Sequence, residues 1–198
     1  MKKTVKQVVG IDVAQKELVV SLGRMYDDWS PELYAGKIFP NNPKGFEDLE
    51  KWVTKMTDSQ VSVRYVMEAT GVYHEKLAYY LADKACRLSV ILPNKISNYF
   101  RTLDAKTITD KTASEAIARF GLERKLDDWK RPAKVFKSLR QLIRERNQLV
   151  EERTMVKNQL HAEQSEAEPN CSSIARTEKR IALLDRQEKE IKAEHAQD

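Results

Sequence analysis

Three acidic residues lie where the sequence predicts that a strand ends or a helix begins. Asp12 lies in the apolar run 8–13, Glu68 ends the run 61–68, and Asp110 precedes a helical pattern. A carboxylate among buried apolar residues is costly unless a hydrogen-bond network, a basic side chain or a metal ion accompanies it. Carboxylates that share a cleft repel one another, and Mg²⁺ relieves that repulsion. Such a site suits phosphodiester chemistry, where paired ions about 3.5–4 Å apart activate the attacking oxygen and stabilise the leaving one.

Each of these acids also has a purely structural interpretation. Asp12 fits an ordinary turn, Glu68 fits the start of a helix, and Asp110 is a typical helix N-cap. Tyr73 and His74, which follow Glu68 after a short Gly-containing turn, are candidates for phosphate or base contact as well as for core packing. The three acids together, each at the end of an element, favour the catalytic interpretation more strongly than any one of them does alone.

The remaining composition narrows the class of protein. The two cysteines and three histidines are scattered without metal-type spacing, so we do not expect a zinc site. The few cysteines fit a reducing, cytoplasmic setting. The sequence lacks an apolar run near the ~20 residues of a membrane span, and the basic N-terminus lacks the features of a signal peptide. We therefore expect a bacterial cytoplasmic protein without membrane contact.

The pattern of elements predicts an α/β fold. Val, Ile and Leu-rich runs alternate with stretches whose apolar residues recur at helical spacing. The expected strands cover 7–13, 17–25, 33–39, 61–68 and 88–92, and the expected helices 44–56, 73–85, 95–103 and 110–123. A three-stranded meander followed by alternating helices and strands indicates a mixed sheet with flanking helices, as in an RNase H-like domain. In that layout the acids at 12, 68 and 110 meet in one cleft.

The sequence changes character after Pro132. Apolar residues recur at heptad-like spacing from 139 to 160 and again from 174 to 191, separated by a break at 166–173. This predicts an α-helical coiled-coil hairpin or two arms, so we expect domains at 1–128 and 129–198. Each stripe is narrow and needs a partner helix, which is either the other arm or a second copy of the chain.

Basic residues concentrate between the predicted acids and the helical arms. Residues 84–140 contain 14 Lys or Arg and six Asp or Glu, an excess larger than the net charge of +5 of the whole chain. Such a concentration favours a polyanionic partner, although a solvated helical surface gives the same pattern. The candidates for nucleic-acid contact are Lys95, Tyr99, Arg101, Lys106, Lys111, Arg119 and Arg124.

Four stretches together resemble a known family. They are VGIDVA at 9–14, MEATGVY at 67–73, VILPN at 90–94 and TDKTASEAIARFG at 109–121. In order, spacing and context they resemble the N-terminal part of the DEDD-type insertion-sequence transposases, relatives of the Piv DNA invertase, over about residues 7–165. The resemblance implies a RuvC-like fold, four acids that bind Mg²⁺, and recombination guided by a bridge RNA.

The resemblance assigns Asp12, Glu68 and Asp110 to the first three acids. The fourth is expected at position 113, on the same helix face as Asp110, where this chain has Ala113. Glu115 lies on another face, so we expect inactivation rather than substitution. The resemblance implies a C-terminal domain that carries a catalytic serine, and we expect this chain to be a fragment without it.

The sequence therefore predicts a transposase or recombinase fragment for RNA-guided DNA rearrangement. Its expected partners are donor and target DNA, a guide RNA, and further copies in a dimer or tetramer formed through the coiled coil. The alternatives are a non-catalytic nucleic-acid-binding and dimerisation module and a RuvC-like junction-resolving nuclease, which Ala113 disfavours. An actin-like sugar kinase needs glycine-rich phosphate loops that the six glycines do not form.

Overall fold

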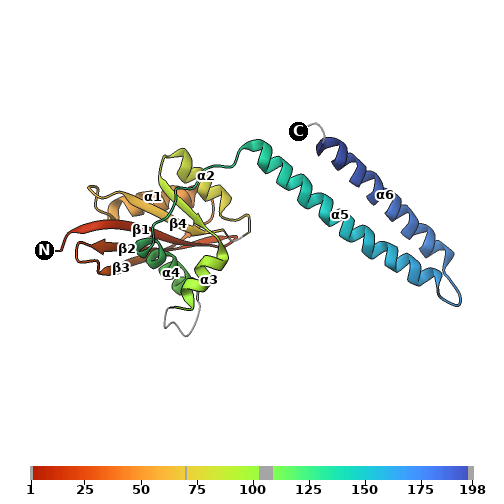
Figure 1. Ribbon diagram of the computed structural model, residues 1–198, viewed down its shortest axis with the longest axis horizontal. Helices are drawn as coiled ribbons and strands as arrows, with labels where there is room; N and C mark the ends of the chain where they lie inside the picture. The colour runs from red at the N-terminus through yellow and green to blue at the C-terminus, as the bar shows by residue number, and fades with distance from the viewer. Residues whose placement is uncertain (1, 70, 103–108, 196–198) are drawn as a thin grey trace. The chain divides into compact units, whose positions relative to one another are not determined.

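The computed structural model describes residues 2–69, 71–102 and 109–195, with Asp110 and His195 described by their backbone alone. The chain forms two compact units, Met1–Arg131 and Pro132–Asp198 (Figure 1). None of the described helices is long and apolar enough to cross a membrane. The elements of the first unit are β1 (Thr4–Val13), β2 (Glu17–Tyr26), β3 (Pro31–Pro40), α1 (Pro43–Met56), β4 (Val63–Glu68), α2 (Glu75–Asp83), β5 (Arg87–Ile91), α3 (Pro93–Phe100) and α4 (Asp110–Glu123).

The first unit is built on one mixed sheet of order β3-β2-β1-β4-β5. The meander β1-β2-β3 is antiparallel, whereas β4 and β5 run parallel to β1. The central strand β1 therefore joins the antiparallel and parallel halves. This arrangement confirms the RNase H-like (RuvC-like) mixed sheet with flanking helices that the sequence predicts.

Side chains of β1 alternate between two apolar cores, as the period of two in a strand requires. Val9 and Ile11 pack with α1 and α2 on one face, in a cluster that includes Phe46 and Leu77. Val8 packs on the other face, in a cluster with α3 and α4. The central strand is consequently covered on both faces, and its sequence is nearly all apolar.

Helix starts follow local sequence signals. Asn42 caps α1, its Oδ1 accepting a hydrogen bond from the Gly45 amide at 2.9 Å. Helix α3 begins two residues before its predicted start, because Pro93 fits the first helical turn. Helix α2 begins two residues later than predicted, after a turn in which Gly71 takes a φ of +53°.

The second unit is a pair of long helices, α5 (Lys134–Gln164) and α6 (Cys171–His195). Leu142 and Val156 of α5 and Leu184 and Ile191 of α6 are buried, each less than 10% exposed. Of the two partners that the sequence left open, the other arm therefore covers the apolar stripe of each helix. This confirms the predicted helical pair that follows the sheet.

A polar layer interrupts the apolar contact between α5 and α6. The Arg153 guanidinium lies 2.9 Å from carboxylate oxygens of both Asp185 and Glu188, and Lys192 lies 2.7 Å from Glu188. The Glu188 side chain is only 8% exposed, so its charge depends on these two cations. A buried polar layer of this kind favours one register of the two helices.

Acid is expected to loosen this helical pair. The hydrogen bond from Lys192 lowers the pKa of Glu188 below its ordinary value of 4.5, and the one from Arg153 lowers the pKa of Asp185. A carboxyl whose pKa is lowered by folding stabilises the folded state above its ordinary pKa and loses that contribution as the pH falls through it. The protection factors of the α6 amides, which compare the observed exchange rate with the intrinsic rate at the same pH, are therefore expected to fall below about pH 4.5. In Glu188→Gln and Asp185→Asn chains this fall is expected to shrink, and protection factors with an unchanged pH profile would contradict the assignment.

Candidate functional site

Asp12 and Glu68 lie at the ends of neighbouring parallel strands. The β1–β4 register pairs residues step by step and ends with Ile11 opposite Met67. Asp12 and Glu68 occupy the next step, at the carboxyl ends of both strands, and both are half-buried. Because residues in register on parallel strands point to the same face, these two carboxylates belong to one site. The structure thus brings together the first two acids predicted from the sequence.

The face of the sheet that carries both acids is the one covered by α4. A Cβ added at Gly10 would overlap the Ser114 carbonyl oxygen and the Ala118 amide nitrogen, so Gly10 faces the backbone of α4. A Cβ at Gly121 would lie 2.9 Å from a methyl of Val66. Since alternate residues of a strand share a face, Asp12 follows Gly10 and Glu68 follows Val66 on the α4 side.

The first turn of α4 lies level with Asp12. Helix α4 runs antiparallel to β1, because its later residue Gly121 meets Val8 and its earlier residue Ser114 meets Gly10. Four helical residues rise about 6 Å and two strand residues advance about 6.6 Å, so the step from Ser114 to Asp110 matches that from Gly10 to Asp12. The first turn of α4 therefore lies near the level of Asp12 along β1, while the side chain of Asp110 lies outside the described residues.

Position 113 lies in the second turn of α4, near the same strand ends. Ala113 is half-buried there and offers only a methyl group. Thr109 caps the helix in a reciprocal box with Thr112, so the first turn is regular up to this residue. The fourth acid that the family pattern predicts is therefore missing from a well-formed helix start.

Two serines that the sequence analysis did not select hold α4 on the sheet. The Oγ atoms of Ser21 and Ser114 lie 2.7 Å apart, and both residues are less than 5% exposed. Ser114 donates to the Lys111 carbonyl at 2.9 Å, so Ser21 is the donor between the two hydroxyls. Ser21 is paired with Gly10 in the β1–β2 register. The only sequence signal was a serine within an apolar strand.

The donor set fits a hard divalent cation in type. Carboxylate oxygens are the ligands that Mg²⁺ and similar ions prefer. Among the residues with described side chains, no group of three His, Cys, Asp or Glu lies close enough together to hold a metal. Asp12 and Glu68 thus provide two acids, and Asp110 contributes a third only through the placement of its backbone.

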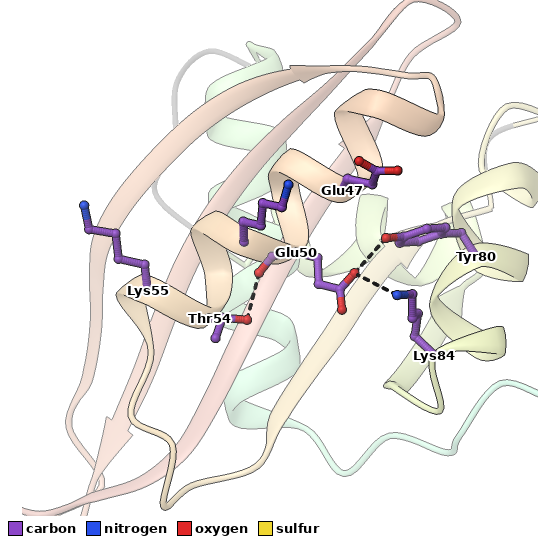
Figure 2. A pocket seen from close by; sticks show the side chains of 7 residues that line it. Glu47, Glu50, Thr54, Lys55, Tyr80 and Lys84 are labelled. Carbon is purple, nitrogen blue, oxygen red and sulfur yellow. Dashed lines mark hydrogen bonds and ion pairs between the residues drawn. The ribbon is translucent and has the colours of Figure 1, made fainter.

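A hollow of about 620 Å³ lies on the opposite face of the sheet, between α1 and α2 (Figure 2). Glu50 accepts a hydrogen bond from the Tyr80 hydroxyl at 2.7 Å and lies 3.8 Å from Lys84. This hydrogen bond raises the pKa of Tyr80 to about 12. Within this hollow Glu50 and Lys84 are paired with each other, and the sheet separates the hollow from Asp12 and Glu68.

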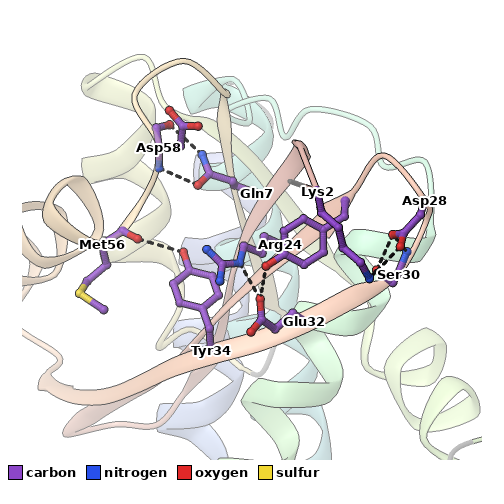
Figure 3. A network of polar contacts seen from close by, with 10 residues as sticks. Lys2, Gln7, Arg24, Asp28, Ser30, Glu32, Tyr34, Met56 and Asp58 are labelled. Carbon is purple, nitrogen blue, oxygen red and sulfur yellow. Dashed lines mark hydrogen bonds and ion pairs between the residues drawn. The ribbon is translucent and has the colours of Figure 1, made fainter.

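Polar contacts also stabilise the opposite end of the sheet, where β1 starts (Figure 3). The Gln7 amide donates to the Asp58 and Val61 carbonyls at 2.9 and 2.8 Å, which fixes the loop before β4. Arg24 lies 2.7 Å from Glu32 and joins β2 to β3. These contacts stabilise the sheet far from the two carboxylates, at the other end of β1.

The structure brings together three of the residues predicted to contact nucleic acid. Lys95 and Tyr99 of α3 and Arg124 after α4 line a hollow of about 450 Å³, together with Lys125, which the sequence analysis did not select. Arg101, Lys111 and Arg119 are exposed. These exposed cations suit contact with a phosphate backbone.

Lys106 and Tyr99, which were also predicted to contact nucleic acid, differ from these exposed cations. Lys106 lies outside the described residues. The Tyr99 ring is 6% exposed and packs edge-on against Phe120, with its hydroxyl donating to Glu123 at 2.8 Å. A ring buried in this way stabilises the contact between α3 and α4, so Tyr99 lines the hollow but offers little surface on which a base could stack.

Comparison with known proteins gives consistent matches. The profile of the IS110-type DEDD transposase family, described as a transposase, matches residues 9–165. The pilin gene-inverting proteins of Moraxella bovis and Moraxella lacunata are each 29% identical to this chain over 153 residues. The matched part is 75% of this chain and 46% of each relative, so the chain spans about half the length of the curated relatives it matches.

Solved structures with a similar fold include two Holliday-junction enzymes. RuvC of Thermus thermophilus is 9% identical, with a TM-score of 0.43, over 62% of this chain and 99% of that one. The fowlpox virus Holliday junction resolvase is 12% identical, with a TM-score of 0.41, over 59% and 98%. Similarity at this level carries no information about substrate.

Proposed function

The chain belongs to the DEDD transposase family of the IS110 type, and we propose that it is the metal-binding and nucleic-acid-binding part of a DNA recombinase. The observation that supports this most is the placement of Asp12 and Glu68 in register on β1 and β4, below the first turn of α4. Carboxylates at the ends of parallel strands, with a helix start above them, are suited to hold a cation beside a phosphodiester.

Asp12, Glu68 and Asp110 would hold Mg²⁺ in this proposal. The ion, when bound, supplies positive charge that stabilises the attacked phosphate and lowers the pKa of a coordinated hydroxyl or water. The chain's own contribution is to fix the carboxylates on rigid elements, with Gly10 and the Ser21–Ser114 pair setting the distance of α4 from the sheet.

Ala113 favours a site that binds nucleic acid but does not cleave it. Without a fourth carboxylate the site has less negative charge with which to hold a cation, and metal affinity follows the number of charged ligands. The second candidate function, a non-catalytic nucleic-acid-binding module, is favoured by this residue. A junction-resolving nuclease with all its chemistry in this domain is disfavoured by it.

We further propose DNA rearrangement as the process this chain serves. The relatives are named for inverting a pilin gene, which is a rearrangement of DNA. Recognition of donor and target DNA through a guide RNA, and assembly into dimers or tetramers through the helical unit, complete the proposal. The exposed cations Lys95, Arg101 and Arg124 suit contact with the DNA and RNA partners.

Charge reversal of the basic hollow is expected to weaken nucleic-acid binding. A Lys95→Glu, Arg124→Glu chain is expected to bind a labelled DNA duplex and an RNA of the same sequence about tenfold more weakly than the parent. Its dependence of log affinity on log salt is expected to be shallower by about two, since two phosphate contacts are lost. Fluorescence anisotropy at several salt concentrations measures both quantities.

The matched control carries the same charge change on the opposite face. Lys51→Glu with Lys55→Glu alters two cations of α1 beside the hollow of Figure 2, and it is expected to lower affinity much less. Equal losses for the two double variants would show that net charge alone, rather than the α3–α4 surface, attracts nucleic acid.

A further inference from the structure

Three turns of the chain meet at the edge of the sheet where Asp12 and Glu68 lie. β1 and β3 point the same way, because each is antiparallel to β2, and β4 is parallel to β1. The turns after β1, β3 and β4 therefore leave the sheet at one edge. Asp12 lies just before the first of these turns and Glu68 just before the third, so the turns flank the two carboxylates that the β1–β4 register places side by side.

Asn41, in the turn after β3, contacts both of the other turns. Its Nδ2 donates to the Ala14 carbonyl at 2.8 Å and to the Tyr73 carbonyl at 3.2 Å. Its backbone amide also donates to the Lys16 carbonyl at 2.9 Å. One side chain thus bridges the segment that follows Asp12 and the segment that follows Glu68.

The amide of Asn41 has one favourable orientation. Both hydrogens of Nδ2 point to carbonyl oxygens, and a flipped amide would place its own oxygen against them. Oδ1 is buried and has no hydrogen-bond partner among the described residues, so no competing contact turns the group the other way. An aspartate of the same shape lacks the donors and cannot replace it.

The turn that carries Asn41 is itself rigid. Asn42 caps α1 through the Gly45 amide, and the Asn42 amide donates to the Pro40 carbonyl at 2.9 Å. A Cβ at Gly45 would overlap the Pro40 carbonyl, so helix and strand end are in close contact. The turn therefore has little freedom, and Asn41 passes this rigidity to the turns on either side.

The segment after β4 needs such a support. It leaves the strand at Glu68 and forms an irregular turn in which Gly71 adopts a φ of +53° before α2 begins at Glu75. Two backbone hydrogen bonds hold its described ends, from the Ala69 amide to the Ile91 carbonyl at 2.8 Å and from the Glu75 amide to the Val72 carbonyl at 3.2 Å, and neither of them reaches the turn after β1. The hydrogen bond from Asn41 to the Tyr73 carbonyl connects this turn to Asn41, which also contacts the turn after β1.

We propose that Asn41 is a positioning residue that fixes the spacing of the Asp12 and Glu68 carboxylates by tying the turns after β1 and β4 together. The proposal rests on the proposed function, in which these two acids share a cation. Residues that orient metal ligands from outside the coordination shell typically change metal affinity by about 10–100-fold when removed.

Two measurements on the full chain test this. Amide hydrogen exchange without metal is expected to accelerate about tenfold or more in Asn41→Ala at Ala14 and Glu75, whose amides donate to the Glu17 and Val72 carbonyls within these turns, with the β1 and β4 core amides little changed. In the Ala113→Asp background, calorimetry is expected to show Mg²⁺ binding about tenfold weaker after Asn41→Ala. Asn41→Asp, which keeps the shape without the donors, is the second variant for the exchange experiment.

The neighbouring cap is the matched control. Asn42→Ala removes the α1 cap and is expected to lower stability by a similar amount, with Mg²⁺ affinity unchanged, so a purely structural effect moves both variants together. Unchanged exchange at both turns in Asn41→Ala would overturn the proposal, as would unchanged Mg²⁺ affinity in a parent that binds. If Ala113→Asp itself binds no Mg²⁺, the proposed function fails, and the exchange result still decides whether Asn41 ties the turns.

Discussion

Ala113→Asp is expected to raise the affinity of the chain for Mg²⁺ by at least about tenfold, or about 1.4 kcal/mol. The residue lies in α4 one turn after Asp110, and the first turn of α4 is level with Asp12. A carboxylate there adds a charged oxygen ligand to those of Asp12 and Glu68. Calorimetric titration of both chains with MgCl₂ measures the difference.

The same substitution is expected to have opposite effects on stability with and without metal. In a metal-free buffer the added carboxylate faces other acids, and like charges close together destabilise the folded state. Saturating Mg²⁺ then stabilises the variant by mass action, because the ion binds the folded state. Thermal melts with EDTA and with excess Mg²⁺ show this as a larger metal-induced shift than in the parent.

Ala113→Asn separates charge from size. It has nearly the shape of aspartate without the charge, so it is expected to leave Mg²⁺ affinity close to that of the parent. If aspartate and asparagine behave alike, or if neither changes binding, position 113 does not face the cation and the four-acid site as placed on α4 is wrong.

Gly10→Ala is expected to be strongly destabilising. The added methyl would overlap the carbonyl oxygen of Ser114 and the amide nitrogen of Ala118, which are backbone atoms of α4. A backbone cannot move aside as a flexible side chain can, so α4 must shift as a whole. Overpacking costs about 1–3 kcal/mol in protein cores, and we expect the upper part of that range, measured by urea denaturation.

A shift of α4 also has a functional consequence. The Ser21–Ser114 hydrogen bond lies beside Gly10, and Asp110 is one helical turn further along. Combined with Ala113→Asp, the Gly10→Ala change is therefore expected to remove most of the gained Mg²⁺ affinity. This coupling would not arise if Gly10 served only the strand.

Gly36→Ala is the matched control in the same sheet. A Cβ at Gly36, which is exposed on the outer strand β3, meets the Val20 carbonyl oxygen at 3.3 Å and the Ser21 Oγ at 4.0 Å, without the overlap found at Gly10. This variant is expected to change the free energy of unfolding by no more than about 0.5 kcal/mol. A Gly10→Ala chain as stable as Gly36→Ala would contradict the close packing of α4 on β1.

The sequence by itself predicted the elements, the mixed sheet, the two strand acids and the alanine at the position of a fourth acid. Strands and helices could be predicted because apolar residues recur with periods of two and 3.6, which follow from local backbone geometry. Asp12 stood out because a charge within the apolar run 8–13 is costly unless it has a partner, even though the following turn offered a structural alternative. The helical arms were evident from their heptads, but not which helix pairs with which.

Only the tertiary structure decided how these pieces meet. The register that places Asp12 beside Glu68 joins residues far apart in the chain, and no local pattern encodes it. The same holds for Asn41, whose amide contacts turns that begin after two other strands, and for Tyr99, whose ring the fold buries. Long-range contacts depend on the packing of the whole sheet and its helices, so they appear only once the chain is folded.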